Sequence, residues 1–257
     1  MRATTHQGLE QLRVHVLGDF EIEGISEHRI GSRKARAVLK ALALARGQSV
    51  RPDALLEIVW GEDLPSRAHK ELSVLVSRLR STLGKDRLPR KQGGYALNLD
   101  WLDVDAMSQL ADESQRRLRD GAYVEALASS LSALTLFRGP VLAEEPEAPW
   151  LIEERQSTEH LAASVRETVA RAALAVGDHD LATAMARLTI THDPYHETAL
   201  ALLMTALVRS GRPASALAEY AVFRDRLSQD LGVDPSREAD EINTAILRNS
   251  PLPALNR

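Results

Sequence analysis

Cationic and hydroxyl side chains recur along one side of a helix that the sequence predicts from Pro65-Ser66 to Leu83-Gly84. At about 100° per residue, one arc of this helix carries Arg67, Lys70, Val74, Ser77, Arg78 and Ser81, with Ser73 and Arg80 on its flank. Long cations reach phosphates and guanine edges, small hydroxyls bond to base edges, and a valine methyl packs on thymine. This is the chemistry of a helix that lies in the major groove of double-stranded DNA.

A solvated basic face would give the same pattern, and the position of the helix in the chain favours DNA. A basic hairpin follows it directly, in which Arg87, Arg90 and Lys91 precede the glycine pair Gly93-Gly94, which suits a tight turn. Residues 66–91 hold eight Lys and Arg against two Asp and Glu. We therefore expect a DNA-reading helix and a wing that contacts the backbone or the minor groove. For Val74 alone, partial burial by packing is the simpler reading.

The elements ahead of this helix must position it. Apolar residues alternate with polar ones from Leu12 to Ile22, which predicts short antiparallel strands. Two further helices are predicted, from Gly31-Ser32 to Gly47 and from Pro52 to Gly61. The third helix has a core-facing stripe formed by Leu72, Leu75, Val76, Leu79 and Leu83. Strands, three helices and a hairpin, in that order, are typical of a winged helix-turn-helix with an N-terminal sheet. Cations at the start of the first helix, Arg33, Lys34 and Arg36, suit either phosphate contacts or surface ion pairs.

From about residue 101 onward, helical patterns replace the strand signals. Gly177 and Gly211 lie 34 residues apart, each with an alanine five positions later, and Gly121 begins the same local spacing. Thirty-four residues is the period of a tetratricopeptide repeat, although Gly121 and Gly177 are 56 residues apart, which is no multiple of it. The Pro- and Glu-rich stretch 139–150 predicts an ordered loop inside this second part, and the tail after Asn249 is expected to fray. The expected domains are therefore 1–100 and 101–257.

Charge and composition agree with this division. The 257 residues carry a formal net charge of −4, yet residues 1–100 hold 17 Lys and Arg against 12 Asp and Glu, and the remainder holds 15 against 24. A basic first part suits a polyanionic partner, and uneven surface charge without one is the alternative. The chain has no Cys, which excludes disulfides, cysteine metal sites and thiol nucleophiles. With no long apolar run, we expect no membrane partner and a cytoplasmic, nucleoid-associated protein.

Catalysis and metal binding find little support in the sequence. His192 and His196 are separated by Pro194, so they straddle a helix boundary, and His179 lies at a turn between helices. The acidic cluster Glu144, Glu145, Glu147, Glu153 and Glu154 is interpreted as a solvated loop. No local motif indicates a nucleophile or a pair of carboxylates set in a pocket. We therefore expect no enzyme, no metal and no cofactor.

The motifs, taken together, resemble the Streptomyces antibiotic regulatory protein (SARP) family. The stretches LRVHVLGDFEI, GSRKARAVLKALAL, LLEIVWGEDLP, LVSRLRSTLG and PRKQGGYALNLD resemble its N-terminal domain. LTLFRGPVLAE, ALVRSGRPASALAEYAVFRDRLSQDLGVDPS and EINTAILR resemble its bacterial transcriptional activation domain, so the resemblance spans about residues 12–248. It implies a mainly α fold: an N-terminal winged helix-turn-helix (α+β, OmpR-type) followed by an all-α tetratricopeptide-like domain.

The resemblance also implies a function. Members activate transcription, commonly of secondary-metabolite genes, by binding direct repeats near the promoter −35 element and engaging RNA polymerase holoenzyme. By position, Lys70, Ser73, Val74, Ser77, Arg78 and Ser81 would face the groove and Arg90, Lys91 and Gly93 would form the wing. We expect a homodimer at least on DNA, and no nucleotide regulation within the chain, because no phosphate-binding glycine motif is present. The alternative is a helical-repeat scaffold or a peptide or ligand sensor with weak or lost DNA binding, which would lack a steep salt dependence of DNA affinity.

Overall fold

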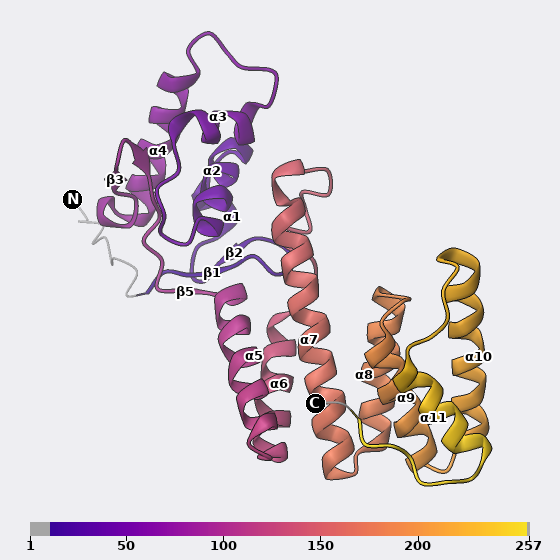
Figure 1. Cartoon of the computed structure of the whole chain (residues 1–257). Coiled ribbons are helices and arrows are strands. Elements are labelled where there is room, and N and C mark those ends of the chain that lie inside the picture. The colour runs from indigo at the N-terminus through magenta and orange to yellow at the C-terminus, as the bar shows by residue number, and fades with distance from the viewer. Residues whose placement is uncertain (1–10, 256–257) are drawn as a thin grey trace. The chain divides into compact units, whose positions relative to one another are not determined.

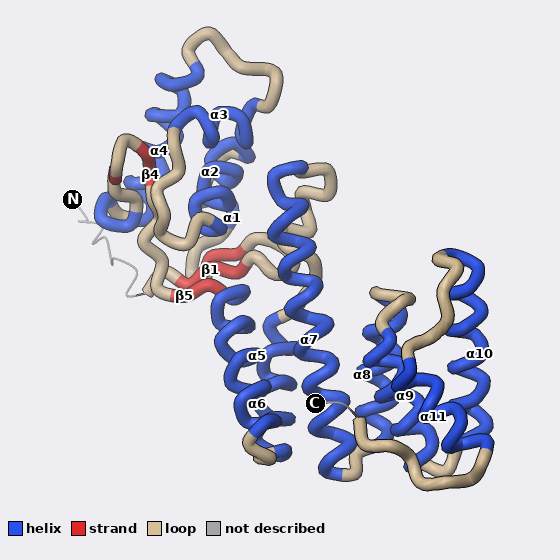
Figure 2. Tube along the Cα trace, viewed as in Figure 1, coloured by secondary structure: helices blue, strands red, loops and turns tan. Residues whose placement is uncertain are grey.

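The structure is a computed structural model that describes residues 11–255, and its described part is mainly helical with a few short strands (Figure 1). Figure 2 shows the strands in red between the helices in blue. The mainly α fold expected from the sequence is confirmed. The elements of the first part are β1 (Arg13–His15), β2 (Glu21–Ile22), α1 (Glu27–Ile30), α2 (Arg33–Leu44), α3 (Pro52–Trp60), α4 (Ala68–Leu83), η1 (Lys85–Arg87), β3 (Arg90–Lys91), β4 (Gly94–Tyr95) and β5 (Trp101–Leu102).

The remainder of the chain is helical. Its elements are α5 (Asp103–Arg119), α6 (Tyr123–Leu136), η2 (Pro149–Leu151), α7 (Ile152–Val176), α8 (His179–His192), α9 (Glu197–Arg209), α10 (Pro213–Asp230) and α11 (Arg237–Leu247). Local sequence explains many of these boundaries. The Ser32 hydroxyl accepts a hydrogen bond from the Ala35 N–H at the start of α2, and Pro52 and Pro213 occupy the first turns of α3 and α10.

A small sheet with strand order β2-β1-β5 underlies the first part. β1 and β2 are antiparallel, with Val14 opposite Ile22, as the alternation predicts. β5 pairs parallel to β1 and was not predicted, because two residues are too few to show a period. Directly after β5, the Asp103 carboxylate accepts hydrogen bonds from the backbone N–H groups of Val16 and Leu17 at 2.9 Å. Burial raises the pKa of Asp103, and these N–H groups oppose the rise.

The chain forms two compact units that alternate along the sequence. The first unit consists of the chain up to Ala106 together with Leu136–Thr158. The second unit consists of Met107–Thr135 together with the chain from Glu159 onward. α5 and α7 each continue through one of these boundaries without a break. The first unit is therefore built from two separate stretches of sequence.

Residues 138–151, which we call the strap, belong to the first unit. The backbone N–H of Leu142 donates to the Val16 carbonyl at 2.8 Å, and that of Ala143 donates to the Gly18 carbonyl at 2.9 Å. The Arg155 guanidinium donates to the Val141, Leu142 and Glu145 carbonyls, each at 2.8 Å. The sequence predicts an ordered loop inside the second domain, whereas these contacts all lie in the first unit.

Lys40 forms ion pairs that hold the strap in this position. Its side chain is only 4% exposed, and its Nζ lies 2.9 Å from a Glu144 carboxylate oxygen and 2.7 Å from one of Glu145. A buried ammonium needs a counter-charge, and the strap supplies two. The interpretation as a solvated loop therefore misses these ion pairs, although the Glu144 and Glu145 side chains keep 33% and 19% of their surface exposed.

The second unit has a repeated helix–turn–helix arrangement. Gly177 and Gly211 have φ of +88° and +77° and lie in the turns between α7 and α8 and between α9 and α10. The alanines five positions later, Ala182 and Ala216, are fully buried in one core cluster. α9 contacts α8, α10 and α11, so every residue from Leu200 to Leu207 is buried.

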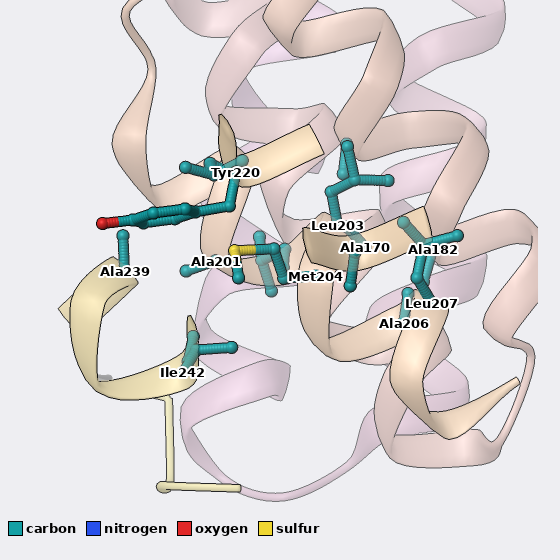
Figure 3. Close-up of a cluster of buried hydrophobic side chains, with 14 of the residues drawn as sticks. Ala170, Ala182, Ala201, Leu203, Met204, Ala206, Leu207, Tyr220, Ala239 and Ile242 are labelled. Atoms are coloured by element: carbon teal, nitrogen blue, oxygen red, sulfur yellow. The ribbon is translucent and has the colours of Figure 1, made fainter. Parts of the chain in front are cut away.

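Figure 3 shows this cluster, in which Met204 of α9 lies with Tyr220 of α10 and Ile242 of α11. Burial, together with a hydrogen bond to Asp240, raises the pKa of Tyr220 to about 12. Leu252 and Leu255 also pack against the cluster. The tail after Asn249, expected to fray, has no helix or strand in the described residues 250–255, and its Leu252 and Leu255 are partly buried against this core.

Candidate nucleic-acid interface

α4 presents two distinct faces. Ala68, Leu72, Leu75, Val76, Leu79 and Leu83 are buried, and α4 packs against α1, α2 and α3. The core-facing stripe predicted from the sequence is therefore confirmed. The helix begins at Ala68, later than the predicted start at Pro65-Ser66, and Arg67 takes the N-cap position without a side-chain cap.

The opposite face of α4 is exposed to solvent. It carries Arg67, Lys70, Ser73, Val74, Ser77, Arg78 and Ser81, all of them exposed, with Val74 at 44%. The Ser73 and Ser81 hydroxyls donate to the His69 and Ser77 carbonyls on their own helix. Their oxygens keep acceptor capacity toward a partner. The structure thus brings seven of the predicted residues together on one surface, and Val74 is not buried by packing.

Arg80 and Arg87 occupy different positions from this set. The Arg80 Nε donates to the Leu88 carbonyl at 2.8 Å, and its guanidinium lies 5.9 Å from the Tyr95 ring centroid. Arg87 forms an ion pair of 2.7 Å with Asp100. The Leu12 N–H and then Arg87 lower the pKa of that carboxyl. Both arginines therefore hold the β3–β4 hairpin and its flanks against the rest of the first unit.

The hairpin itself differs from the prediction by one residue. Lys91 pairs with Gly94, so the turn residues are Gln92 and Gly93, both with left-handed φ, of +48° and +80°. This is the geometry that a two-residue hairpin turn requires. Tyr95 exchanges two backbone hydrogen bonds with Val50, at 2.8 and 2.9 Å, which ties the hairpin to the α2–α3 connection.

Gly94 has a steric role in this tie. A Cβ there would collide with the Val50 carbonyl oxygen and would lie 2.6 Å from the Ser49 Oγ. We expect Gly94→Ala to lower the free energy of unfolding by about 1–3 kcal/mol, because the backbone must shift. Gly93→Ala meets nothing within 4 Å and should lose about 1 kcal/mol for its left-handed backbone. Urea unfolding of both variants checks this, and a Gly94→Ala loss no larger than that of Gly93→Ala would contradict it.

Ion pairs separate the cations of the first unit into two groups. Arg13, Arg33, Arg36, Lys40, Arg46, Arg87 and Arg138 each lie within ion-pair distance of a carboxylate. Within residues 11–255, no carboxylate lies at that distance from Arg67, Lys70, Arg78, Arg90 or Lys91. Five cations without a counter-charge thus lie on the exposed face of α4 and on the hairpin, although other cations of the described first unit, among them Arg29, Lys34 and Arg51, also lack one. A surface of this kind attracts a polyanion.

The same contacts divide the α2 cations, which from the sequence suit either phosphate contacts or surface ion pairs. Arg33 pairs with Glu145 at 3.6 Å and Arg36 with Glu27 at 3.8 Å. Lys34 has no ion pair in the described part of the chain, and its Nζ lies 4.7 Å from the Trp60 ring centroid.

Other kinds of site have no counterpart in the described residues. No group of three or more His, Asp or Glu side chains there is placed to hold a metal ion. His192 ends α8 and His196 caps α9, so the two lie at a helix boundary. A search of those residues also finds no helix with the length and apolarity that crossing a bilayer requires.

Two protein-family models match the chain. The model "Transcriptional regulatory protein, C terminal" matches residues 28–96, and "Bacterial transcriptional activator domain" matches residues 102–247. The two matches meet near residue 100. They cover the α4 face and the hairpin on one side and most of the helical part on the other.

Curated relatives and a solved structure agree with these matches. Regulatory protein AfsR of Streptomyces griseus is 37% identical over 243 residues, which cover 93% of this chain and 25% of AfsR, so the chain spans about a quarter of that relative. Regulatory protein DnrI of Streptomyces peucetius is 32% identical over 86% of both chains. The structure of Mycobacterium tuberculosis EmbR in complex with a low affinity phosphopeptide superposes with a TM-score of 0.86 at 28% identity, over 95% of this chain and 66% of that one.

Proposed function

The chain belongs to the Streptomyces antibiotic regulatory protein family of transcriptional regulators, and from this premise we propose that it binds promoter DNA through α4 and the β3–β4 hairpin. The observation that carries the proposal is the set of exposed cations without an ion pair to any described residue on the α4 face and the hairpin, namely Arg67, Lys70, Arg78, Arg90 and Lys91. Arg78 reads a guanine edge, the serines of α4 bond to neighbouring bases, and Val74 packs on a thymine methyl. Arg90 and Lys91 contact the backbone from the hairpin turn at Gly93.

The second unit completes the proposal. Residues 107–135 and 159–257, which form it, hold 13 Lys and Arg against 17 Asp and Glu, so its net charge is negative and it is repelled by DNA. It matches the activator-domain model over most of its length. We assign to it the recruitment of RNA polymerase holoenzyme, by two protomers that occupy tandem direct repeats near the −35 element. The genes so activated would belong to secondary metabolism, as the AfsR and DnrI likeness suggests.

Footprinting of promoter fragments with and without holoenzyme tests this function. We expect two adjacent protected sites in the same orientation, with protection that extends toward the −35 element once holoenzyme is added. Binding should also weaken steeply with salt, with a slope of log K against log salt of about −4 to −7 for five to eight phosphate contacts. Protection without orientation, or affinity that does not depend on salt, would contradict the proposal.

A further inference from the structure

A hollow of about 340 Å³ lies beside the first half of α4. Four cations line it, Lys34 from α2 and Arg67, Lys70 and Arg78 from α4, together with one carboxylate, Glu71. Trp60 of α3 supplies an apolar wall. Three helices thus contribute to one concave site with an excess of positive charge.

Lys34 differs from its neighbours on α2 in what it contacts. Arg33 and Arg36 are engaged by Glu145 and Glu27, whereas Lys34 lies against the Trp60 ring. Attraction between an ammonium and an indole face holds the cation in place without neutralising it. Lys34 is therefore fixed at the hollow with its charge available to an anion.

In the part of the chain that the structure describes, the indole N–H of Trp60 lacks a hydrogen-bond acceptor. Its side chain is 9% exposed, and its indole Nε1 is buried with no hydrogen-bond partner within the described residues. A buried N–H donor without an acceptor is costly, and native structures rarely leave one so. Because this N–H is shielded from solvent, Trp60 serves the hollow as an apolar wall, and the cations supply the contacts for a bound anion.

We propose that this hollow is a seat for one backbone phosphate of the bound DNA, and that Lys34 is the cation that α2 contributes to it. The inference rests on the proposed function. A phosphate held between α2 and α4 fixes how deep α4 enters the groove and in which register, because phosphate contacts position the protein while base contacts specify the sequence. Lys34 is thus a positioning residue outside the recognition helix.

The test is Lys34→Met in the full chain, since methionine keeps an apolar stem against Trp60 and removes the charge. On a random-sequence duplex, the slope of log K against log salt should lose about 0.9 in magnitude, and affinity at 150 mM salt should fall about fivefold, as expected for one phosphate contact. The loss should be the same on every sequence. The matched control is Arg33→Gln, one residue away and already paired, which should leave the slope unchanged.

A backbone scan identifies the partner group. Single methylphosphonate substitutions remove one phosphate charge at a time from the footprinted site. At one position the wild type should lose clearly more affinity than Lys34→Met does, because the variant has already lost one of the contacts to that phosphate. Losses that add at every position would overturn the seat. A competition with inorganic phosphate at constant ionic strength gives a second test. If phosphate displaces DNA from the wild type but not from Lys34→Met, the hollow is a site for free phosphate, and the proposal is contradicted.

Failure of the inference and failure of the proposed function are distinguishable. A wild-type chain that binds no DNA contradicts the function. A wild type that binds with a steep salt slope, together with a Lys34→Met variant of equal slope, contradicts only the seat. Thermal unfolding of Lys34→Met should match the wild type, and a lowered melting temperature with an unchanged slope would assign Lys34 a structural role instead.

Discussion

In a chain that carries both Glu144→Ala and Glu145→Ala, the free energy of unfolding is expected to fall by about 3–5 kcal/mol, because the Lys40 ammonium stays buried without a counter-charge. The wild-type side chain is 4% exposed and lies within 2.9 Å of both carboxylates. With so little of the Lys40 side chain exposed, solvent replaces these carboxylates poorly. Chemical denaturation of the double variant measures the loss.

The matched control removes the charge that the double variant leaves behind. Adding Lys40→Met to the two alanine substitutions should recover much of the lost stability, because no buried ion then remains. A triple variant as unstable as the double variant would contradict the argument. The loss would then come from the strap's packing and not from an uncompensated charge.

Acid should weaken the same contact. Burial acts to raise the pKa of Glu145, but the hydrogen bond and charge of Lys40 outweigh burial, and the pKa lies below its ordinary value of 4.5. A carboxyl whose pKa is lower in the folded state stabilises the fold above its unfolded pKa, and this contribution is lost as the pH falls through the folded value. Below about pH 4.5, the wild type should therefore lose stability more steeply than the triple variant.

The second large effect concerns DNA. Lys70→Ala together with Arg78→Ala should weaken promoter binding by about 2–4 kcal/mol, of which Arg78 supplies about 1–3 if it reads a base edge. The two single variants should differ in kind. Arg78→Ala relaxes specificity at one base pair, whereas Lys70→Ala weakens binding to all sequences and lowers the salt slope by about 0.9.

The control is the same loss of charge in the helical unit, by Arg187→Ala with Arg212→Ala. These side chains are partly exposed and paired with Glu219 and Asp180. Fluorescence anisotropy on the footprinted site compares the two double variants. Unchanged binding by the α4 variant would defeat the assignment of α4 as the recognition helix.

Local patterns explain which parts of the molecule sequence reasoning could predict. The period of α4 predicts both its buried and its exposed face, because each depends only on residues three and four positions apart. The turn glycines at 177 and 211 were predicted for the same reason. The hairpin register was missed by one residue, because Gly94 is required by its contact with Val50, 44 positions earlier, and not by the turn.

Distant pairing explains the rest. From the sequence alone, Lys40 is one more residue of an amphipathic helix, and Glu144 and Glu145 are part of an acidic loop. Nothing local to either segment indicates that they meet. The hollow at Lys34 and Trp60 has the same origin, since three helices must pack before it exists.

The interrupted order of the first unit has a consequence for synthesis. Its N-terminal stretch leaves the ribosome long before the strap does, and at 5–20 residues per second the interval between residues 106 and 158 lasts roughly 3–10 s. During that time Lys40 lacks the Glu144 and Glu145 carboxylates, and the backbone of residues 16–18 lacks its hydrogen bonds to the strap. The nascent winged helix therefore stays incomplete, with a buried lysine lacking its counter-charges, until a later part of the chain has been translated. Its maturation is set by the speed of elongation as much as by its own folding rate.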